Sequence, residues 1–194
     1  MTTATITGYR ILQVPVKRLA WRGGVLFLEQ ELTRCAHGGF SLLGGASRCE
    51  LLGHGLFRHR QLRFLFEQRT EPEAPSGFEY VVSYVKLKPQ PAGDPHLYAR
   101  DATEMLNRYS RYGYEVTEFL GWRGHWLIVH ERPVDGPARS TPRYEAMAVP
   151  REQVERSKPA PWPHDRITIA VLATQTHLFP IQVVHTASAS QSGE

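Results

Sequence analysis

The sequence predicts an α+β protein built from tandem β-α-β-β units, and three observations carry this prediction. A segment of 12 residues occurs twice in related form, at residues 31–42 and at residues 105–116. Each copy carries an apolar pattern of helical spacing that ends at glycine. Runs rich in β-branched and aromatic residues flank both copies. Because related sequences build the same supersecondary unit, both copies are expected to share one topology.

The first unit is expected to span residues 1–70. Residues 8–17 form a β-rich run that predicts a strand, and Pro15 near its end is typical of an edge or a bulge. From Val25 the apolar residues lie on one helical face. Gly38 and Gly39 then end the helix, because glycine accepts the left-handed conformation at that position. Further strands are predicted at residues 40–43 and 62–67, separated by a glycine-punctuated stretch at residues 44–55.

The second unit is expected to span residues 78–133, after a Pro/Glu-rich linker. Residues 78–88 predict a strand. Asp94 followed by Pro95 predicts the start of a helix, since aspartate caps the free N–H groups and proline needs no donor at the first position. Gly113 closes this helix. Strands are predicted at residues 114–120 and 125–132, joined by a short glycine-containing turn.

The third segment, residues 143–185, is β-rich. Strands are predicted at residues 144–149, 167–174 and 178–185, with a short helix at residues 150–156 and an extended proline-rich loop at residues 157–164. Two interpretations are open: a degenerate third copy of the unit, or a β-rich extension that pairs with the sheet of another unit. The small polar residues of the tail, 186–194, predict disorder.

The second unit resembles a small bacterial family catalogued as domain of unknown function 4177. The resemblance is carried by Tyr80–Val82, Leu106–Asn107, Gly113–Val116 and Glu131–Pro133. Members usually have Trp where Tyr114 stands. The first unit resembles the family more distantly, through Tyr9, Leu32, Gly39–Phe40 and Phe66–Arg69; it lacks the Asn after Leu32 and contains the glycine-rich insertion. The resemblance implies a compact β-α-β-β fold and implies no activity.

Composition indicates an ordinary soluble protein. The 194 residues are 41% hydrophobic and 22% charged, and no apolar run approaches the ~20 residues of a membrane-spanning helix. The N-terminus lacks the pattern of a secretory signal. The two cysteines, Cys35 and Cys49, are too few for a disulfide framework and are expected to be reduced thiols. These observations predict a cytoplasmic location and no contact with a membrane.

No catalytic or metal-binding pattern is found in the sequence. His125 and His130 are five residues apart on one predicted strand, so they point to opposite faces and cannot share a metal. No nucleophile elbow is present, and Cys35 falls on the core face of its predicted helix, where a thiol is inert. No catalytic residue, metal ligand or cofactor is predicted, and a non-catalytic protein is favoured over an enzyme.

The favoured function is therefore a non-catalytic binding or assembly module. Small β-α-β-β units expose strand edges, which pair readily with another chain. Self-association or a protein partner is expected. Trp122 in a turn and Trp162 between prolines are the candidate partner-binding residues, although a tryptophan in such a loop equally often covers a core.

Nucleic-acid binding is the alternative function. Residues 1–70 contain ten Lys or Arg against four Asp or Glu, within a net charge of +4 for the whole chain. A sheet face that carries arginine and exposed aromatic rings can bind phosphate and stack bases. Phe64 and Phe66 lie beside the basic residues, but their shared strand face is equally explained by a core. The candidate residues for binding single-stranded or duplex nucleic acid are Arg48, Arg58, Arg60, Arg63 and Arg69.

Overall fold

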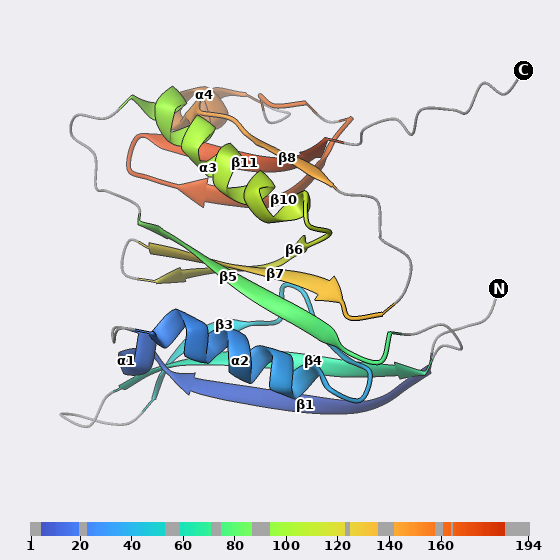
Figure 1. Ribbon diagram of the computed structural model, residues 1–194. Coiled ribbons are helices and arrows are strands. Elements are labelled where there is room, and N and C mark those ends of the chain that lie inside the picture. The colour runs from blue at the N-terminus through green and yellow to red at the C-terminus, as the bar shows by residue number, and fades with distance from the viewer. Residues whose placement is uncertain are drawn as a thin grey trace, which may run out of the picture. The chain divides into compact units, whose positions relative to one another are not determined.

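The computed structural model describes residues 5–19, 23–52, 59–70, 75–86, 94–122, 125–135, 142–157, 161–163 and 165–184 (Figure 1). These residues form 4 helices and 11 strands, and the strands are arranged in three antiparallel sheets. The predicted α+β class is confirmed.

The chain forms two compact units. The first contains Met1–Leu87 and Tyr114–Arg139, and the second contains Lys88–Gly113 and Ser140–Glu194. The helix of the second predicted β-α-β-β unit therefore belongs to one compact unit and its strands to the other. The predicted unit boundaries, at residues 1–70, 78–133 and 143–185, describe the sequence repeats and stay predictions.

Sheet A, in the first compact unit, comes from the first repeat. Its order is β1 (Thr5–Pro15), β4 (His59–Thr70), β2 (Phe40–Leu42), and β3 (Arg48–Leu52) also pairs with β4. The sequence prediction was wrong at two places. Strand β3 lies within the stretch expected to be only glycine-rich, and the short helix α1 (Val16–Leu19) begins where a strand was expected to continue. Helix α2 (Gly24–Ala36) ends as predicted, with Gly38 and Gly39 at φ of 81° and 77°.

Sheet B, in the same compact unit, has the order β5 (Phe78–Lys86), β7 (His125–Pro133), β6 (Glu115–Trp122). Sheets A and B enclose one hydrophobic core together with α2. Its most buried members include Leu28, Leu32, Phe64, Phe66 and Val129, each 0% exposed. The first compact unit thus has one hydrophobic core to which both repeats contribute.

Sheet C, in the second compact unit, has the order β10 (Ile167–Ala173), β11 (His177–Val184), β8 (Arg143–Ala146), and β9 (Val149–Pro150) pairs with β11. The unit also contains α3 (Pro95–Ser110) and α4 (Arg151–Arg156). Helix α3 begins as predicted, because the Asp94 carboxylate accepts a hydrogen bond of 2.9 Å from the His96 N–H. All described strands of this sheet come from the third segment, so the interpretation as an extension that pairs with another unit's sheet is wrong for the described residues.

The three sheets share one topology. In each, the last strand of the repeat lies between the first and the middle strand: β1-β4-β2, β5-β7-β6 and β8-β11-β10. Tyrosines of the three first strands occupy matching positions, with Tyr9 opposite Glu67, Tyr80 opposite Glu131 and Tyr144 opposite Val183. On their other side, the same residues of the central strands pair with the middle strands: Glu67 with Ser41, Glu131 with Glu115 and Val183 with Ile167. The third segment therefore has the organisation of the first two.

An irregularity in the middle strand also recurs. Strand β6 has a bulge between Val116 and Glu118, and β10 has one between Thr168 and Ala170, each just after the second paired residue. In sheet A the corresponding place, after Leu42, holds the segment that separates β2 from β3. The glycine-rich insertion of the first repeat thus lies where the other two repeats have a single extra residue.

Helix α2 covers the open edge of the next repeat's sheet. Strand β5 is an edge strand, whose outward N–H groups would otherwise lack partners. Thr33 Oγ1 accepts from the Tyr80 N–H at 3.2 Å, and Glu29 Oε1 accepts from the Val82 N–H at 2.8 Å. Side chains four residues apart lie on one helix face, so a single helix satisfies alternate donors of the strand.

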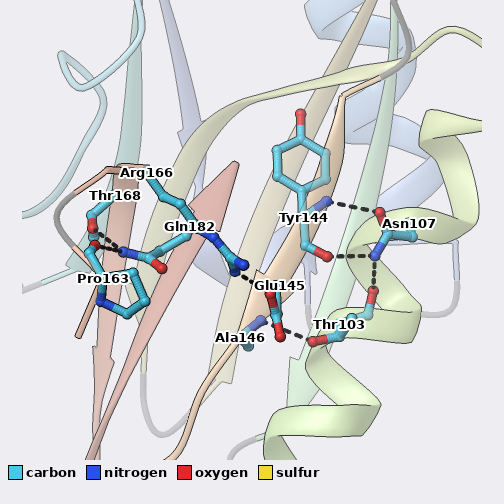
Figure 2. A network of polar contacts seen from close by, with 9 residues as sticks. All are labelled: Thr103, Asn107, Tyr144, Glu145, Ala146, Pro163, Arg166, Thr168 and Gln182. Atoms are coloured by element: carbon cyan, nitrogen blue, oxygen red, sulfur yellow. Dashed lines mark hydrogen bonds and ion pairs between the residues drawn. The ribbon is translucent and has the colours of Figure 1, made fainter. Parts of the chain in front are cut away.

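Helix α3 repeats this arrangement on β8 (Figure 2). Thr103 Oγ1 accepts from the Ala146 N–H, and Asn107 Oδ1 accepts from the Tyr144 N–H, both at 2.9 Å. Asn107 Nδ2 also donates to the Tyr144 carbonyl at 2.7 Å. In the duplicated sequence segment Asn107 corresponds to Thr33. Two different side chains therefore perform one structural role in the two repeats.

Replacing Thr33 with valine is expected to lower the free energy of unfolding by about 1–2 kcal/mol, because the Tyr80 N–H loses its acceptor in a partly buried site. Urea denaturation measures the change. The control is Glu31→Gln in the same helix, which alters only the exposed pair with Arg34 and should cost less than about 0.5 kcal/mol. Equal effects of the two substitutions would contradict the role given to Thr33.

Replacing Asn107 with alanine is expected to accelerate hydrogen exchange at the Tyr144 amide by about tenfold or more, because its acceptor is removed. Amide exchange followed by NMR measures this locally. Glu104→Ala, an exposed change on the same helix, serves as control and should leave the Tyr144 amide unchanged. An unchanged rate in the Asn107 variant would show that α3 does not protect β8.

Candidate interaction surfaces

The buried polar groups between sheets A and B form a structural connection. The Tyr80 hydroxyl donates to Glu131 Oε2, and the Leu42 N–H lies 3.0 Å from the hydroxyl and 3.3 Å from the carboxylate. Burial and the neighbouring carboxylate raise the pKa of Tyr80 far above its ordinary value. Glu118 Oε2 similarly accepts from the Ser47 N–H at 3.1 Å. Both carboxylates thus serve backbone donors of the preceding repeat.

A second buried polar pair lies on the other face of sheet B. Ser83 Oγ is 2.9 Å from His130 Nε2, and the two residues are 6% and 0% exposed. Burial lowers the pKa of His130 to about 4, so the imidazole is neutral at physiological pH. A neutral, fully buried histidine beside a buried hydroxyl fits a role in the packing of sheet B.

The outer face of sheet A is the first exposed surface that carries large apolar side chains. We use this name for the side chains that point away from the core shared with sheet B: Tyr9, Ile11 and Gln13 of β1, Arg48 and Glu50 of β3, and Gln61, Arg63, Leu65 and Glu67 of β4. Glu67, opposite Tyr9, is 4% exposed, so this face is covered at that position. Tyr9 is 60% exposed and Ile11 is 50% exposed. Large apolar side chains next to each other on an exposed sheet face are typical of a binding surface.

The predicted basic cluster is only partly brought together. Arg48 is exposed and lies directly opposite Arg63 across β3 and β4, on the outer face of sheet A. Arg60 is also exposed but alternates with Arg63, so it lies on the opposite face of β4. Arg58 and the side chain of Arg69 lie outside the described residues. The nucleic-acid role of these residues stays a prediction.

The aromatic residues next to the basic cluster do not offer stacking surfaces. Phe64 and Phe66 are 0% exposed and belong to the core. Arg63 is moreover 3.6 Å from Glu50, which reduces the positive charge of the outer face. The exposed ring of this face, Tyr9, was not among the sequence candidates, because the sequence does not show which face of β1 meets the core.

The edge of β10 is the second exposed surface. Strand β10 is terminal in sheet C, and no other described strand pairs with its far side. Its seven residues, Ile-Thr-Ile-Ala-Val-Leu-Ala, carry no charge. Ile167, Ile169 and Val171 are 58%, 36% and 40% exposed. Natural edge strands usually carry charges, proline or a bulge that prevents pairing with other chains; β10 carries neither charge nor proline, and its bulge between Thr168 and Ala170 leaves Ala170–Ala173 as the regular part of the edge.

The two candidate tryptophans are placed differently. Trp162 is half-buried, and the adjacent Pro163 carbonyl accepts from Gln182 Nε2 at 2.7 Å, which ties this loop to sheet C (Figure 2). The backbone of Trp122 lies at the end of β6, and its side chain is outside the described residues. Partner binding by either tryptophan stays a prediction.

The part of the chain that the structure describes lacks two further classes of feature. It contains no group of three or more His, Cys, Asp or Glu side chains that could hold a metal ion. It also contains no helix long and apolar enough to span a membrane. Cys35 and Cys49 are free, half-buried thiols, and burial raises the pKa of Cys35.

Comparison with known proteins finds no family model, curated protein or solved structure that matches this chain. The resemblance of the second repeat to the family of unknown function stays a prediction carried by the residues quoted for it.

Acidification is expected to destabilise the protein through His130. Its folded pKa of about 4 lies below the unfolded value near 6.5, so the unfolded chain binds more protons between these values. The free energy of unfolding should therefore fall by up to about 3 kcal/mol as the pH decreases from 6.5 to 4, and this contribution should level off below 4.

Urea denaturation of the wild type and of His130→Gln over this pH range measures the effect. Glutamine keeps a hydrogen-bonding group but does not titrate, so the difference between the two curves isolates the histidine. Parallel curves would show that His130 is not buried as a neutral group.

Proposed function

We propose that this chain is a non-catalytic assembly module that binds another polypeptide by strand addition at the edge of β10. The observation that carries the proposal is the uncharged, terminal position of β10 with three exposed β-branched side chains. The free N–H and C=O groups of such an edge supply main-chain affinity, and the side chains on either face supply apolar contact.

The organisation of the repeats supports this function. Polar side chains in the shared core and at the helix–strand contacts accept hydrogen bonds from backbone N–H groups of a neighbouring repeat. Their role is to join repeats to one another. If a strand edge pairs in the same way with a different chain, the result is assembly of the two chains.

Strand addition is favoured over nucleic-acid binding by the arrangement of the charges. Of the five candidate arginines, only Arg48 and Arg63 share a described face, and Glu50 lies within 3.6 Å of Arg63. The neighbouring phenylalanines are buried. By contrast, no charge or covering strand interrupts the edge of β10 among the described residues.

Replacing Val171 with lysine is expected to weaken association of the chain by about tenfold or more, because the charge would be brought into an apolar strand pairing. Sedimentation velocity over about 1–100 µM measures the association. The matched control is Leu97→Lys on α3, a residue 45% exposed in the same compact unit, which should associate like the wild type.

Hydrogen exchange gives a second readout of the same edge. The β10 amides that point away from β11 should be protected in the wild type and should exchange rapidly in the Val171→Lys variant. A monomeric wild type whose outward β10 amides exchange at the rate of free peptide would overturn the proposal.

A further inference from the structure

We infer that the free edge of β1 is the docking site for an acidic α-helix of a partner protein, one that carries two hydrogen-bond acceptors four residues apart. Strand β1 is terminal in sheet A, which lies in the first compact unit. The β10 edge lies in the second compact unit. This site and its partner therefore differ from those of strand addition at β10, and each can be tested without the other.

The N–H groups of Tyr9 and Ile11 point away from sheet A. Tyr9 pairs with Glu67 of β4, and Ile11 pairs with Leu65. The Leu65 carbonyl accepts from the Leu43 N–H at 2.8 Å, directly after β2. In an antiparallel pair, opposite residues either bond each other or both point away from each other, and the two kinds of pair alternate along the strands. The backbone groups of Leu65 and Glu67 are directed towards β2, so those of Tyr9 and Ile11 face outward.

The equivalent N–H groups of the other two repeats bind a helix. In sheet B, those of Tyr80 and Val82 donate to side chains of α2 at 3.2 and 2.8 Å. In sheet C, those of Tyr144 and Ala146 donate to side chains of α3 at 2.9 Å each (Figure 2). No described helix or loop accepts from the corresponding pair in β1. The first strands of two repeats thus show what kind of element fits this edge.

The two helices that cover such an edge share one arrangement of side chains. Each presents two acceptors four residues apart and, three positions further on, a small buried residue. This spacing places the three side chains on one face of a helix. The sets are Glu29, Thr33 and Ala36 in α2, and Thr103, Asn107 and Ser110 in α3.

The described helices of a second copy do not supply this face. Helices α2 and α3 already use their acceptors on β5 and β8 within each chain. Helix α1 has only four residues. In α4 the two pairs four residues apart, Arg151 with Glu155 and Glu152 with Arg156, each contain an arginine, which accepts no hydrogen bond. The occupant is therefore assigned to a helix of another protein.

The charge around the β1 edge favours an acidic helix. Residues 5–19, which form β1 and α1, contain Arg10, Lys17 and Arg18 and no Asp or Glu, and all three basic side chains are exposed. In α2 one of the two acceptors is the carboxylate of Glu29. A carboxylate is a stronger acceptor for a backbone N–H than a neutral oxygen, and nearby basic residues add complementarity of charge.

Tyr9 and Ile11 also offer apolar contact beside these donors. Their side chains are 60% and 50% exposed. A helix at this edge therefore makes hydrogen bonds to the N–H groups of both residues and apolar contact with their side chains. An amphipathic helix presents a polar and an apolar face together, so it satisfies both requirements.

A peptide with the sequence of residues 24–39 is the probe, because it carries the acceptor face of α2. A covalent staple in place of Leu26 and Gln30, both exposed on α2, keeps the peptide helical, since an isolated helix of this length is marginal in water. Under reducing conditions the full chain is expected to bind it with a dissociation constant below about 100 µM, measured by fluorescence anisotropy. The matched control peptide contains Glu29→Ala and Thr33→Val and should bind about tenfold more weakly or worse.

Two variants of the full chain localise the binding. Ile11→Pro removes the outward N–H and keeps the pairing with β4, because proline is tolerated on an edge strand whose N–H faces solvent. Ile11→Ala keeps this N–H and is the matched control. Ile11 corresponds to Val82, whose N–H donates to a carboxylate. Ile11→Pro is therefore expected to bind the peptide about tenfold more weakly than Ile11→Ala.

Hydrogen exchange of the wild type gives a readout that needs no variant. The peptide should slow exchange of the Tyr9 and Ile11 amides by about tenfold or more. Circular dichroism and urea denaturation verify that both Ile11 variants are folded, and the exchange measurement decides alone if Ile11→Pro is not. Val171→Lys should bind the peptide like the wild type, which separates this site from the β10 edge.

Four outcomes would overturn the inference. They are no saturable binding at about 500 µM peptide, equal affinities for the two peptides, equal affinities of folded Ile11→Pro and Ile11→Ala, and binding that leaves the Tyr9 and Ile11 amides unprotected. The last outcome includes a peptide that displaces α2 from β5 instead of docking on β1. Acceptor-dependent binding that protects the two β1 amides supports the inference.

Discussion

The structure depends on one recurring interaction, in which two side chains four residues apart on a helix accept hydrogen bonds from the first strand of the following repeat. Glu29 and Thr33 of α2 serve β5, and Thr103 and Asn107 of α3 serve β8. Without these acceptors an edge strand would present unpaired N–H groups beside an apolar core. The interaction covers the edge and fixes which repeat the helix contacts, so it joins consecutive repeats into larger cores.

Local sequence signals predicted most elements, because helix ends and strand patterns are properties of neighbouring residues. Asp94 and Gly113 marked the limits of α3 correctly. Local signals do not predict which strand each helix contacts, since α2 and β5 are distant in sequence and their contact depends on tertiary packing. The duplication does indicate that Thr33 and Asn107 are equivalent, because they occupy the same position in the two copies and both carry a side-chain oxygen. Their shared role became evident only when both acceptors were seen facing strand N–H groups.

The candidate surfaces show the same division between local and tertiary information. The sequence grouped Arg60 with Arg63 because the strand was predicted only for residues 62–67; β4 in fact begins at His59, so strand alternation places the two side chains on opposite faces. The sequence could not show that Tyr9 and Ile11 point away from the core, because Tyr80 and Val82 at the equivalent positions point into it. Nor could it show that β10 is terminal in its sheet, because strand order follows from long-range pairing. Exposure of these apolar residues is therefore a result of the fold.

Equivalent positions of the repeated unit can lie in a core or on the surface. Tyr9 and Ile11 of β1 are 60% and 50% exposed, whereas Tyr80 and Val82 at the equivalent positions of β5 are 4% and 5% exposed. The difference follows from the neighbours, because Tyr80 and Val82 belong to the core that sheet B shares with sheet A and α2, and no described sheet packs against Tyr9 and Ile11. Helix α4 has six residues and buries none of them, unlike α2 and α3. The sequence of a unit therefore specifies its strands and their order, whereas the neighbouring elements decide which of its faces is buried.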